Sequence, residues 1–242
     1  MSFVHSLRSC LPAVALALIC STAHAFTFDS ENVFSANFRE MKKSGNTAWK
    51  WDSSSKSMRI SPVASGAYAH AKSAADASKP AQTTFTVSEG ETLSVEIGFS
   101  AGTPRSSLGI YIIDPKNENK GYLALYNIDN TGNDDLLRFV TNAAPLTSGA
   151  GGISKAKGFS APGLELGEKA TLRFTYGIKD KKGVMTLAVS NGAGVQVHSA
   201  SYRMTEVGKP LTTFEIGFRY AAQNGKGDFV INNFDASVAR SK

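Results

Sequence analysis

Cysteine is scarce in this chain of 242 residues. Its two cysteines, Cys10 and Cys20, lie within the first 20 residues, so the remainder has neither a disulfide nor a thiol. After residue 25, no segment has the roughly 18 consecutive apolar residues of a membrane-spanning helix. The sequence therefore predicts no thiol chemistry and no stable membrane insertion for most of its length.

The chain also lacks nucleotide-binding motifs and has few side chains that bind metals. The chain has no Walker-type Gly-Lys-Ser/Thr and no dinucleotide-binding glycine fingerprint ahead of a helix. Beyond residue 25 it has two histidines, His70 and His198, which leaves little with which to bind zinc. These absences argue against P-loop NTPases, dinucleotide-dependent enzymes and zinc enzymes.

The first 25 residues have the features of a secretory signal peptide. His5 and Arg8 give a weakly basic start, residues 10–20 are apolar, and residues 23–25 (Ala-His-Ala) form a small-residue cleavage site. Cleavage before Phe26 leaves 217 residues with 25 basic and 20 acidic side chains, a net charge of +5. The sequence thus predicts a signal peptide at residues 1–25 and one secreted or periplasmic domain at residues 26–242.

Short stretches that alternate apolar and polar residues recur through the rest of the chain, separated by Gly, Asn, Asp and Pro. Residues 92–99 and 213–220 show the pattern most clearly, and their similar segments 94–102 and 213–221 are expected to be neighbouring strands. Further strands are expected at residues 47–52, 57–61, 67–72, 83–88, 108–114, 121–127, 136–141, 170–179, 184–190, 195–204 and 228–238.

Two segments depart from this strand pattern. Residues 31–43 are the one candidate helix. Residues 142–163 are rich in glycine and are expected to form a long loop, which is either functional or a mobile surface excursion.

Many short antiparallel strands, each with one buried face, close economically into a two-sheet sandwich. The strands resemble those of the concanavalin A-like lectin/glucanase superfamily, particularly its laminin G-like jelly rolls. The resemblance is carried by FSANF (34–38), Trp49 and Trp51, residues 92–99, 108–113 and 121–126, and the closing segments FEIGFRY and GDFVINNF. In that superfamily the last strand often reads Ile-Asp-Asn, and here residues 231–233 read Ile-Asn-Asn. The resemblance implies an all-β, antiparallel two-sheet jelly-roll sandwich.

Enzymes of the superfamily have motifs that this chain lacks or matches only in part. Its glycoside hydrolases carry Glu-x-Asp-x-x-Glu on one strand, which is absent here. Gln196-Val197-His198 resembles the Gln-(Ile/Val)-His motif of alginate lyases, but the Arg-x-Glu-x-Arg strand of those enzymes is missing. If the chain is a polysaccharide lyase, His198 is the candidate base and Gln196 a candidate partner for the uronate carboxylate.

Aromatic and arginine side chains at outward strand positions form a candidate ligand-binding set. Such side chains can stack on sugar rings and pair with carboxylates or sulfates. The predicted set is Tyr111, Tyr122, Tyr126, Arg138, Arg173, His198, Tyr202 and Arg219. The sequence does not say which of these residues share a sheet.

Alternating oxygen-bearing side chains in one predicted loop suggest a metal site. Asp129, Asn133 and Asp135 are candidate ligands for a structural calcium ion, although the glutamate that closes an EF-hand loop is absent. No other cofactor is expected.

These patterns favour an exported, non-catalytic carbohydrate-binding or surface-interaction module. Its basic residues are spread along the chain, so an anionic glycan is a more suitable partner than nucleic acid. Two alternatives stay open: a polysaccharide lyase or glycoside hydrolase acting on an acidic polysaccharide, and a structural protein of the envelope or matrix.

Overall fold

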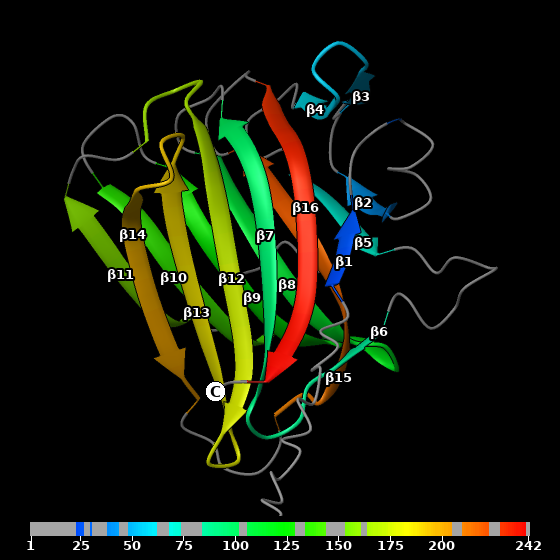
Figure 1. Ribbon diagram of the computed structural model, residues 1–242, viewed down its shortest axis with the longest axis vertical. Coiled ribbons are helices and arrows are strands. Elements are labelled where there is room, and N and C mark those ends of the chain that lie inside the picture. The colour runs from blue at the N-terminus through cyan, green and yellow to red at the C-terminus, as the bar shows by residue number, and fades with distance from the viewer. Residues whose placement is uncertain are drawn as a thin grey trace, which may run out of the picture.

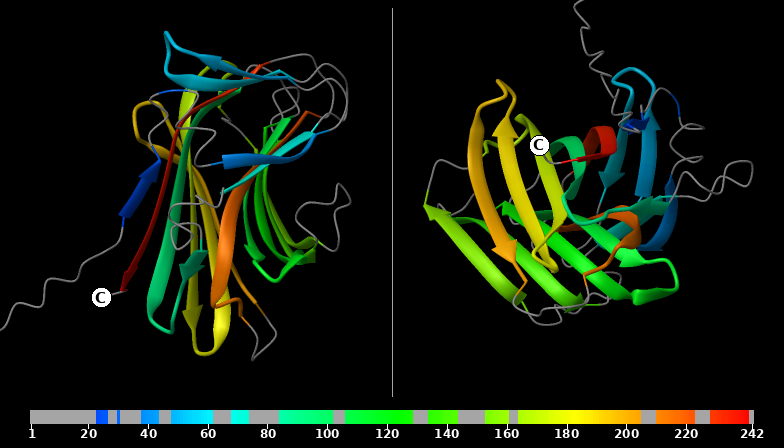
Figure 2. Two further views of the ribbon diagram at one scale, coloured as in Figure 1. Left: turned by 90° about the vertical axis from the view of Figure 1, so that its right-hand side faces the viewer. Right: turned by 60° about the horizontal axis from the view of Figure 1, so that its bottom comes forward.

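The computed structural model describes residues 23–26, 30, 38–43, 48–61, 68–73, 84–101, 106–128, 134–143, 153–160, 164–204, 210–222 and 228–240. Two antiparallel sheets pack face to face, as Figure 1 and the side view in Figure 2 show. The all-β two-sheet sandwich predicted from the alternation is confirmed. Within the described ranges, no helix is long and apolar enough to cross a membrane.

Each sheet is built from a continuous path of paired strands. Sheet A runs in the order β14 (Gln196–Arg203), β13 (Lys182–Asn191), β12 (Lys169–Lys179), β7 (Glu91–Ala101), β16 (Phe229–Arg240), β4 (Ser57–Ser61) and β3 (Ala48–Asp52), with β1 (Ala23–Phe26) also paired to β16. Sheet B runs in the order β11 (Ile153–Ser160), β10 (Asp134–Ala143), β9 (Asn117–Ile128), β8 (Ser106–Asp114), β15 (Thr213–Ala222), β5 (Tyr68–Ser73) and β2 (Phe38–Lys43), with β6 (Thr84–Thr86) also paired to β15.

The main core lies between the two sheets and is rich in aromatic rings. Phe218 of β15 is fully buried, and its ring centroid lies 5.5 Å from that of Phe38, 5.9 Å from Trp49 and 6.2 Å from Phe234. These rings come from both sheets, so the cluster joins them. Burial of this apolar surface is the main force that holds a sandwich without disulfides together.

The two segments with the clearest alternation lie in different sheets. The apolar residues of β7 (Leu93, Val95, Ile97 and Phe99) all face the core with no exposed surface, as predicted. However, β7 is a central strand of sheet A, whereas β15 is in sheet B. The expectation that residues 94–102 and 213–221 are neighbouring strands is therefore wrong: they share a burial pattern because both face the same core.

Tertiary pairing overrides local sequence preference in two further segments. The candidate helix at residues 31–43 is wrong for its second half, which forms β2 and pairs with β5. Phe38 of β2 is buried against the core, and that contact favours the strand. Likewise, the long loop expected at residues 142–163 contains β11, which pairs with β10.

A close approach between β7 and β16 explains one glycine of the chain. The pairing register of β16 shifts between Ile231 and Asn233, within the Ile-Asn-Asn segment. A Cβ atom on Gly98 would lie 1.8 Å from Asn233 Oδ1. Only glycine allows Asn233 to lie over β7 at this irregularity.

The expected cleavage position falls within β1. This strand pairs with β16 from Ala23–Ser237 to Phe26–Phe234. Cleavage before Phe26 would leave only the last residue of β1 in the mature chain. The rest of the expected signal peptide, residues 1–22, lies outside the described residues.

Candidate functional site

The surface of sheet B that faces away from the core holds three residues of the predicted ligand-binding set. Arg138 of β10 pairs with Leu125 of β9, Leu125 pairs with Gly109 of β8, and Gly109 pairs with Arg219 of β15. These four residues thus form one row across four strands. With a strand spacing of about 4.8 Å, the Cα atoms of the two arginines are roughly 14 Å apart. Tyr111 lies in the adjacent row, opposite Leu123.

An apolar cluster, separate from the main core, occupies the middle of this surface. Tyr111, Ile113, Leu123 and Val140 are buried there, and Leu125 packs against them. The clusters on both sides of sheet B explain why β8 is buried at nearly every position. Tyr111 does face away from the main core, but its ring has no exposed surface, so it is part of the apolar floor and not an open stacking platform.

Charged side chains accompany this apolar floor. Arg138, Glu215 and Arg219 are all half-buried on the same surface. Arg138 Nε is buried, and among the described residues it has no hydrogen-bond partner. A buried donor without an acceptor costs free energy that an incoming anion can recover. We call this surface, made of Arg138, Glu215 and Arg219 around the apolar floor, the sheet B face.

Tyr126, Asp135 and His198 form a buried polar cluster between the sheets. The Tyr126 hydroxyl donates to Asp135 Oδ2, and His198 Nε2 lies 3.0 Å from the same oxygen. Burial raises the pKa of Tyr126, and the hydrogen bond to Asp135 raises it further. The predicted outward positions of Tyr126 and His198 are therefore wrong: both point into the core, where Asp135 satisfies their polar atoms.

The lyase-like arrangement is not present in the structure. His198 is 4% exposed and lies between the sheets, where a polysaccharide does not reach it. Gln196 is exposed, and a bulge in the β13–β14 pairing separates the two residues. The structure therefore places the His198 ring inside the sandwich beside Asp135, apart from Gln196, and the role of His198 as a catalytic base stays a prediction.

The other predicted ligand-binding residues are spread over the molecule. Tyr122 is buried in the main core, with its ring 5.8 Å from that of Tyr176, so its predicted outward position is wrong. Tyr202 is half-buried and stacks on Phe139. Arg173 is exposed as predicted, but it lies on sheet A and pairs with Glu96 at 2.6 Å.

One further segment has the sequence spacing of a catalytic motif but not the backbone geometry that the motif requires. Residues 98–102 read Gly-Phe-Ser-Ala-Gly, the spacing of a nucleophile elbow. Ser100 lies within β7, where it pairs with Lys169 and Val230 on the two neighbouring strands. A nucleophile elbow is a sharp turn between a strand and a helix, so Ser100 is a strand residue and not a nucleophile of that kind.

Of the three predicted calcium ligands, only Asp135 lies among the residues that the structure describes. Asp129 and Asn133 lie outside the described residues. Asp135 is buried and bonded to Tyr126 and His198. In the described part of the chain, no three acidic, histidine or cysteine side chains gather as a metal site would require. Calcium binding stays a prediction.

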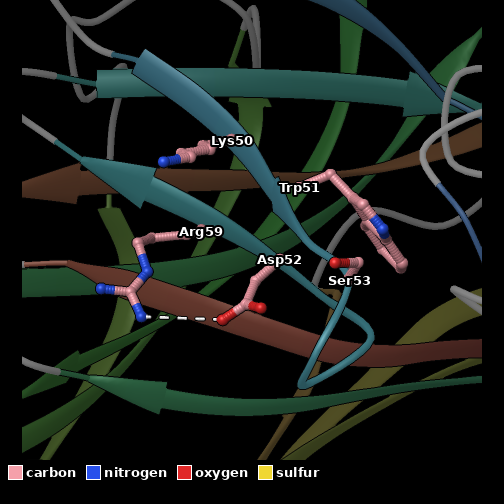
Figure 3. Close-up of a pocket in the computed structure, with 5 residues that line it drawn as sticks. All are labelled: Lys50, Trp51, Asp52, Ser53 and Arg59. Carbon is pink, nitrogen blue, oxygen red and sulfur yellow. Dashed lines mark ion pairs between the residues drawn. The ribbon is translucent and has the colours of Figure 1, made fainter.

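The structure also contains a cavity lined by polar residues that was not among the predicted sites. It has a volume of about 370 Å³ and lies against the β3–β4 hairpin, lined by Lys50, Trp51, Asp52, Ser53 and Arg59 (Figure 3). The signal was present in the sequence: charged residues alternate with the tryptophans in Trp49-Lys50-Trp51-Asp52, just before a serine-rich turn.

Side-chain hydrogen bonds build this hairpin locally. Asp52 Oδ1 accepts hydrogen bonds from the Ser54 backbone N–H at 2.9 Å and the Ser54 hydroxyl at 2.6 Å. Bonds from Ser54 and Ser55 lower the pKa of Asp52 to about 2. On the β16 side of β4, Arg59 Nη1 donates to Asp228 Oδ2 at 2.6 Å. Arg59 is therefore anchored by a carboxylate just before β16.

Replacing Asp228 by asparagine is expected to destabilise the protein at neutral pH but not in acid. Bonds from the Ser61 hydroxyl and from Arg59 lower the pKa of Asp228, so its stabilising effect is present above the unfolded-state pKa of about 3.9 and is lost as pH falls through the lower folded-state value. Thermal denaturation of Asp228→Asn and the native protein should show a gap in Tm that narrows below about pH 4. A gap that stays constant down to about pH 2 would contradict the assignment.

Comparisons with known proteins identify the fold. No protein-family model matches the sequence, and no curated protein matches it either. Among solved structures, the chain is similar to a lectin from Bauhinia forficata in complex with GalNAc, at 12% identity and a TM-score of 0.58, covering 92% of this chain and 100% of the lectin. It is also similar to winged bean acidic lectin complexed with methyl-α-D-galactose, at 10% identity and a TM-score of 0.59, with the same coverages.

A protein of unknown function from Shewanella oneidensis is similar as well, at 14% identity and a TM-score of 0.53, covering 91% of this chain and 87% of that protein. The legume lectins are members of the concanavalin A-like lectin/glucanase fold. The chain therefore has this fold, as its resemblance implied, and identities this low show the fold alone.

Proposed function

We propose that this chain is an exported, non-catalytic carbohydrate-binding module for acidic glycans, and that the sheet B face is its binding surface. The observation that carries the proposal is the buried Nε of Arg138, which has no hydrogen-bond partner among the described residues. A planar guanidinium donates two parallel hydrogen bonds to a carboxylate or sulfate. Leu125, the half-buried residue that packs against the apolar floor, lies beside Arg138 in the same row and can contact the C–H face of a sugar ring.

Three further observations support the proposal. Two lectins with the same fold were solved with sugars bound. The net charge of +5 expected after cleavage favours an anionic partner. The sequence has no Glu-x-Asp-x-x-Glu motif, and His198 is buried away from both outer surfaces, which favours binding without turnover.

Replacing Arg138 by glutamine is expected to weaken binding to an acidic polysaccharide by at least about tenfold, the loss of one charge-assisted hydrogen bond. Arg138→Lys keeps the charge but not the planar pair of donors, so its affinity should fall between that of Arg138→Gln and the native protein. Isothermal titration with alginate, polygalacturonate and heparin, and with neutral dextran for comparison, measures these affinities.

Arg173→Gln is the matched control, because Arg173 is an outward strand arginine on the opposite sheet. Its affinity should equal that of the native protein. Equal affinities of Arg138→Gln and Arg173→Gln would place binding elsewhere on the molecule. Failure to bind any of the polysaccharides would favour the structural alternative. A rise in ultraviolet absorbance from unsaturated uronates would overturn the non-catalytic part of the proposal.

A further inference from the structure

The cavity at the β3–β4 hairpin lies on a different sheet from the sheet B face. The hairpin extends sheet A beyond β16, since β4 pairs with residues 229–231 at the start of that strand. Figure 2 shows the hairpin at one end of the sandwich. The cavity volume of about 370 Å³ falls within the range of small-molecule sites. Four of its five lining residues carry a charged or hydroxyl group and the fifth is Trp51, so the lining suits an occupant with polar groups.

Two cationic side chains face each other across the hairpin. Lys50 and Arg59 are directly paired residues on β3 and β4. Figure 3 shows both side chains on one side of the hairpin, with Trp51 on the other. Like charges at opposed positions of a strand pair are destabilising. Among the described residues, the Lys50 ammonium has no ion pair or hydrogen bond. The charge of Arg59 is balanced by its ion pair with Asp228, whereas the charge of Lys50 is not balanced by a described residue.

Arg59 is held so that one edge of its guanidinium stays available. Nη1 is bonded to Asp228 at 2.6 Å, whereas Nη2 forms only a long ion pair with Asp52 Oδ2, at 4.0 Å (dashed line in Figure 3), and makes no hydrogen bond to it. The anchored Nη1 fixes the position of Nη2, which is therefore a positioned donor at the cavity. Together, Arg59 Nη2 and Lys50 Nζ form a two-point site for an anionic group.

Asp52 adds an acceptor beside these donors. Its Oδ1 is occupied by Ser54, and its Oδ2 is directed towards Arg59 across the cavity. With a pKa of about 2, the carboxylate is ionised at neutral pH and can only accept hydrogen bonds. An occupant that satisfies it must carry a hydrogen-bond donor, and the hydroxyl groups of a sugar are suitable donors. The exposed Ser53 hydroxyl lies at the same cavity and can donate or accept.

We propose that this hairpin cavity binds a small anion that carries hydroxyl groups, such as a sugar acid or a sugar sulfate. The anionic group pairs with Lys50 and Arg59, and a neighbouring hydroxyl donates to Asp52. The site is independent of the sheet B face, since the two lie on different sheets and share no residue. It provides a second binding site, which takes a single acidic sugar or the terminal sugar of a polysaccharide chain.

Intrinsic tryptophan fluorescence gives a direct test. The chain has two tryptophans, Trp49 and Trp51, and Trp51 lines the cavity. In a Trp49→Phe variant, Trp51 is the sole reporter. Titration with glucuronate and with glucose 6-sulfate should give saturable changes in emission. Glucose, which lacks the anion, and acetate, which lacks the hydroxyls, should bind at least about tenfold more weakly at equal ionic strength.

The two anionic probes also distinguish the source of the ligand. Tighter binding of glucuronate assigns the site to carboxylated sugars, and tighter binding of the sulfate assigns it to sulfated ones. A response to acetate or sodium chloride equal to that of both probes would overturn the proposal, because it would reflect charge screening alone. Absence of saturable binding of glucuronate and glucose 6-sulfate both in the fluorescence titration and in isothermal titration, which does not depend on Trp51, would overturn it as well.

Charge-removing variants locate the binding. In the Trp49→Phe background, Lys50→Gln should weaken glucuronate binding by about tenfold. Lys50 is exposed and has no described partner, so this change should leave the fold intact. Lys116→Gln removes an exposed lysine at the β8–β9 turn and should have no effect. Equal affinities of these two variants would overturn the assignment.

The proposal for the hairpin cavity and the proposal for the sheet B face can be tested independently. Arg138→Gln should leave the fluorescence titration unchanged, and Lys50→Gln should leave polysaccharide binding at the sheet B face unchanged. Loss of glucuronate binding in Arg138→Gln would mean that the cavity is not an independent site.

Discussion

Replacing Asp135 by alanine is expected to lower the free energy of unfolding by about 2–5 kcal/mol. Asp135 is 3% exposed, accepts a hydrogen bond from the Tyr126 hydroxyl and lies 3.0 Å from His198 Nε2. The substitution takes this acceptor from two groups buried between the sheets and leaves a cavity. Because Asp135 and His198 belong to opposite sheets, the change also removes a polar link across the sandwich. For a domain of this size, Tm should fall by roughly 5–15 °C.

Asparagine variants separate the loss of charge from the loss of volume. Asp135→Asn keeps the size of the side chain and one acceptor oxygen, so its effect should be smaller than that of Asp135→Ala. Asp180→Asn is the matched control, because Asp180 is an exposed aspartate paired with Arg203. An exposed pair contributes at most about 1 kcal/mol. Differential scanning calorimetry checks all three, and equal Tm values for Asp135→Asn and Asp180→Asn would contradict a role for the buried carboxylate charge.

Replacing Phe218 by alanine is expected to cost about 3–5 kcal/mol, the usual range for a fully buried aromatic residue. Its ring contacts Phe38 from sheet B and Trp49 and Phe234 from sheet A. Removal of the ring leaves a cavity that the strands of a sandwich close only in part. Equilibrium urea denaturation should show a lower midpoint with little change in the m-value.

Two milder variants calibrate this result. Phe218→Leu retains much of the apolar volume and should lie between Phe218→Ala and the native protein. Leu166→Ala should change stability by no more than about 0.5 kcal/mol, because the Leu166 side chain is 44% exposed. If Phe218→Ala lowered the free energy of unfolding by no more than the change expected for Leu166→Ala, the aromatic cluster would not hold the two sheets together.

The strand pattern was largely predictable because a period of two is a local property. In β7 and β15, alternate residues are apolar, and the structure buries them as predicted. The helix expected at residues 31–43 is wrong at residues 38–43, because the burial of Phe38 depends on Phe218 and Phe234, which lie far away in the sequence. Local propensity carries no information about such partners.

The candidate binding residues were less predictable, since alternation separates two faces without saying which one is the core. Arg138 and Arg219 do lie on one outer surface, in the same row of sheet B. His198 was expected to face outward because it is polar. It faces inward because Asp135, 63 residues earlier in the chain, supplies an acceptor inside the sandwich.

The sequence by itself determined that this protein is built from antiparallel strands without disulfides, since periodicity, turn residues and cysteine positions are local features. Only the tertiary structure decided which sheet each strand joins, and therefore which polar residues meet. That choice depends on contacts between segments distant in the chain. It brings Tyr126, Asp135 and His198 together inside the core, places Arg138 and Arg219 on one outer face, and sets Lys50 opposite Arg59 at the hairpin cavity.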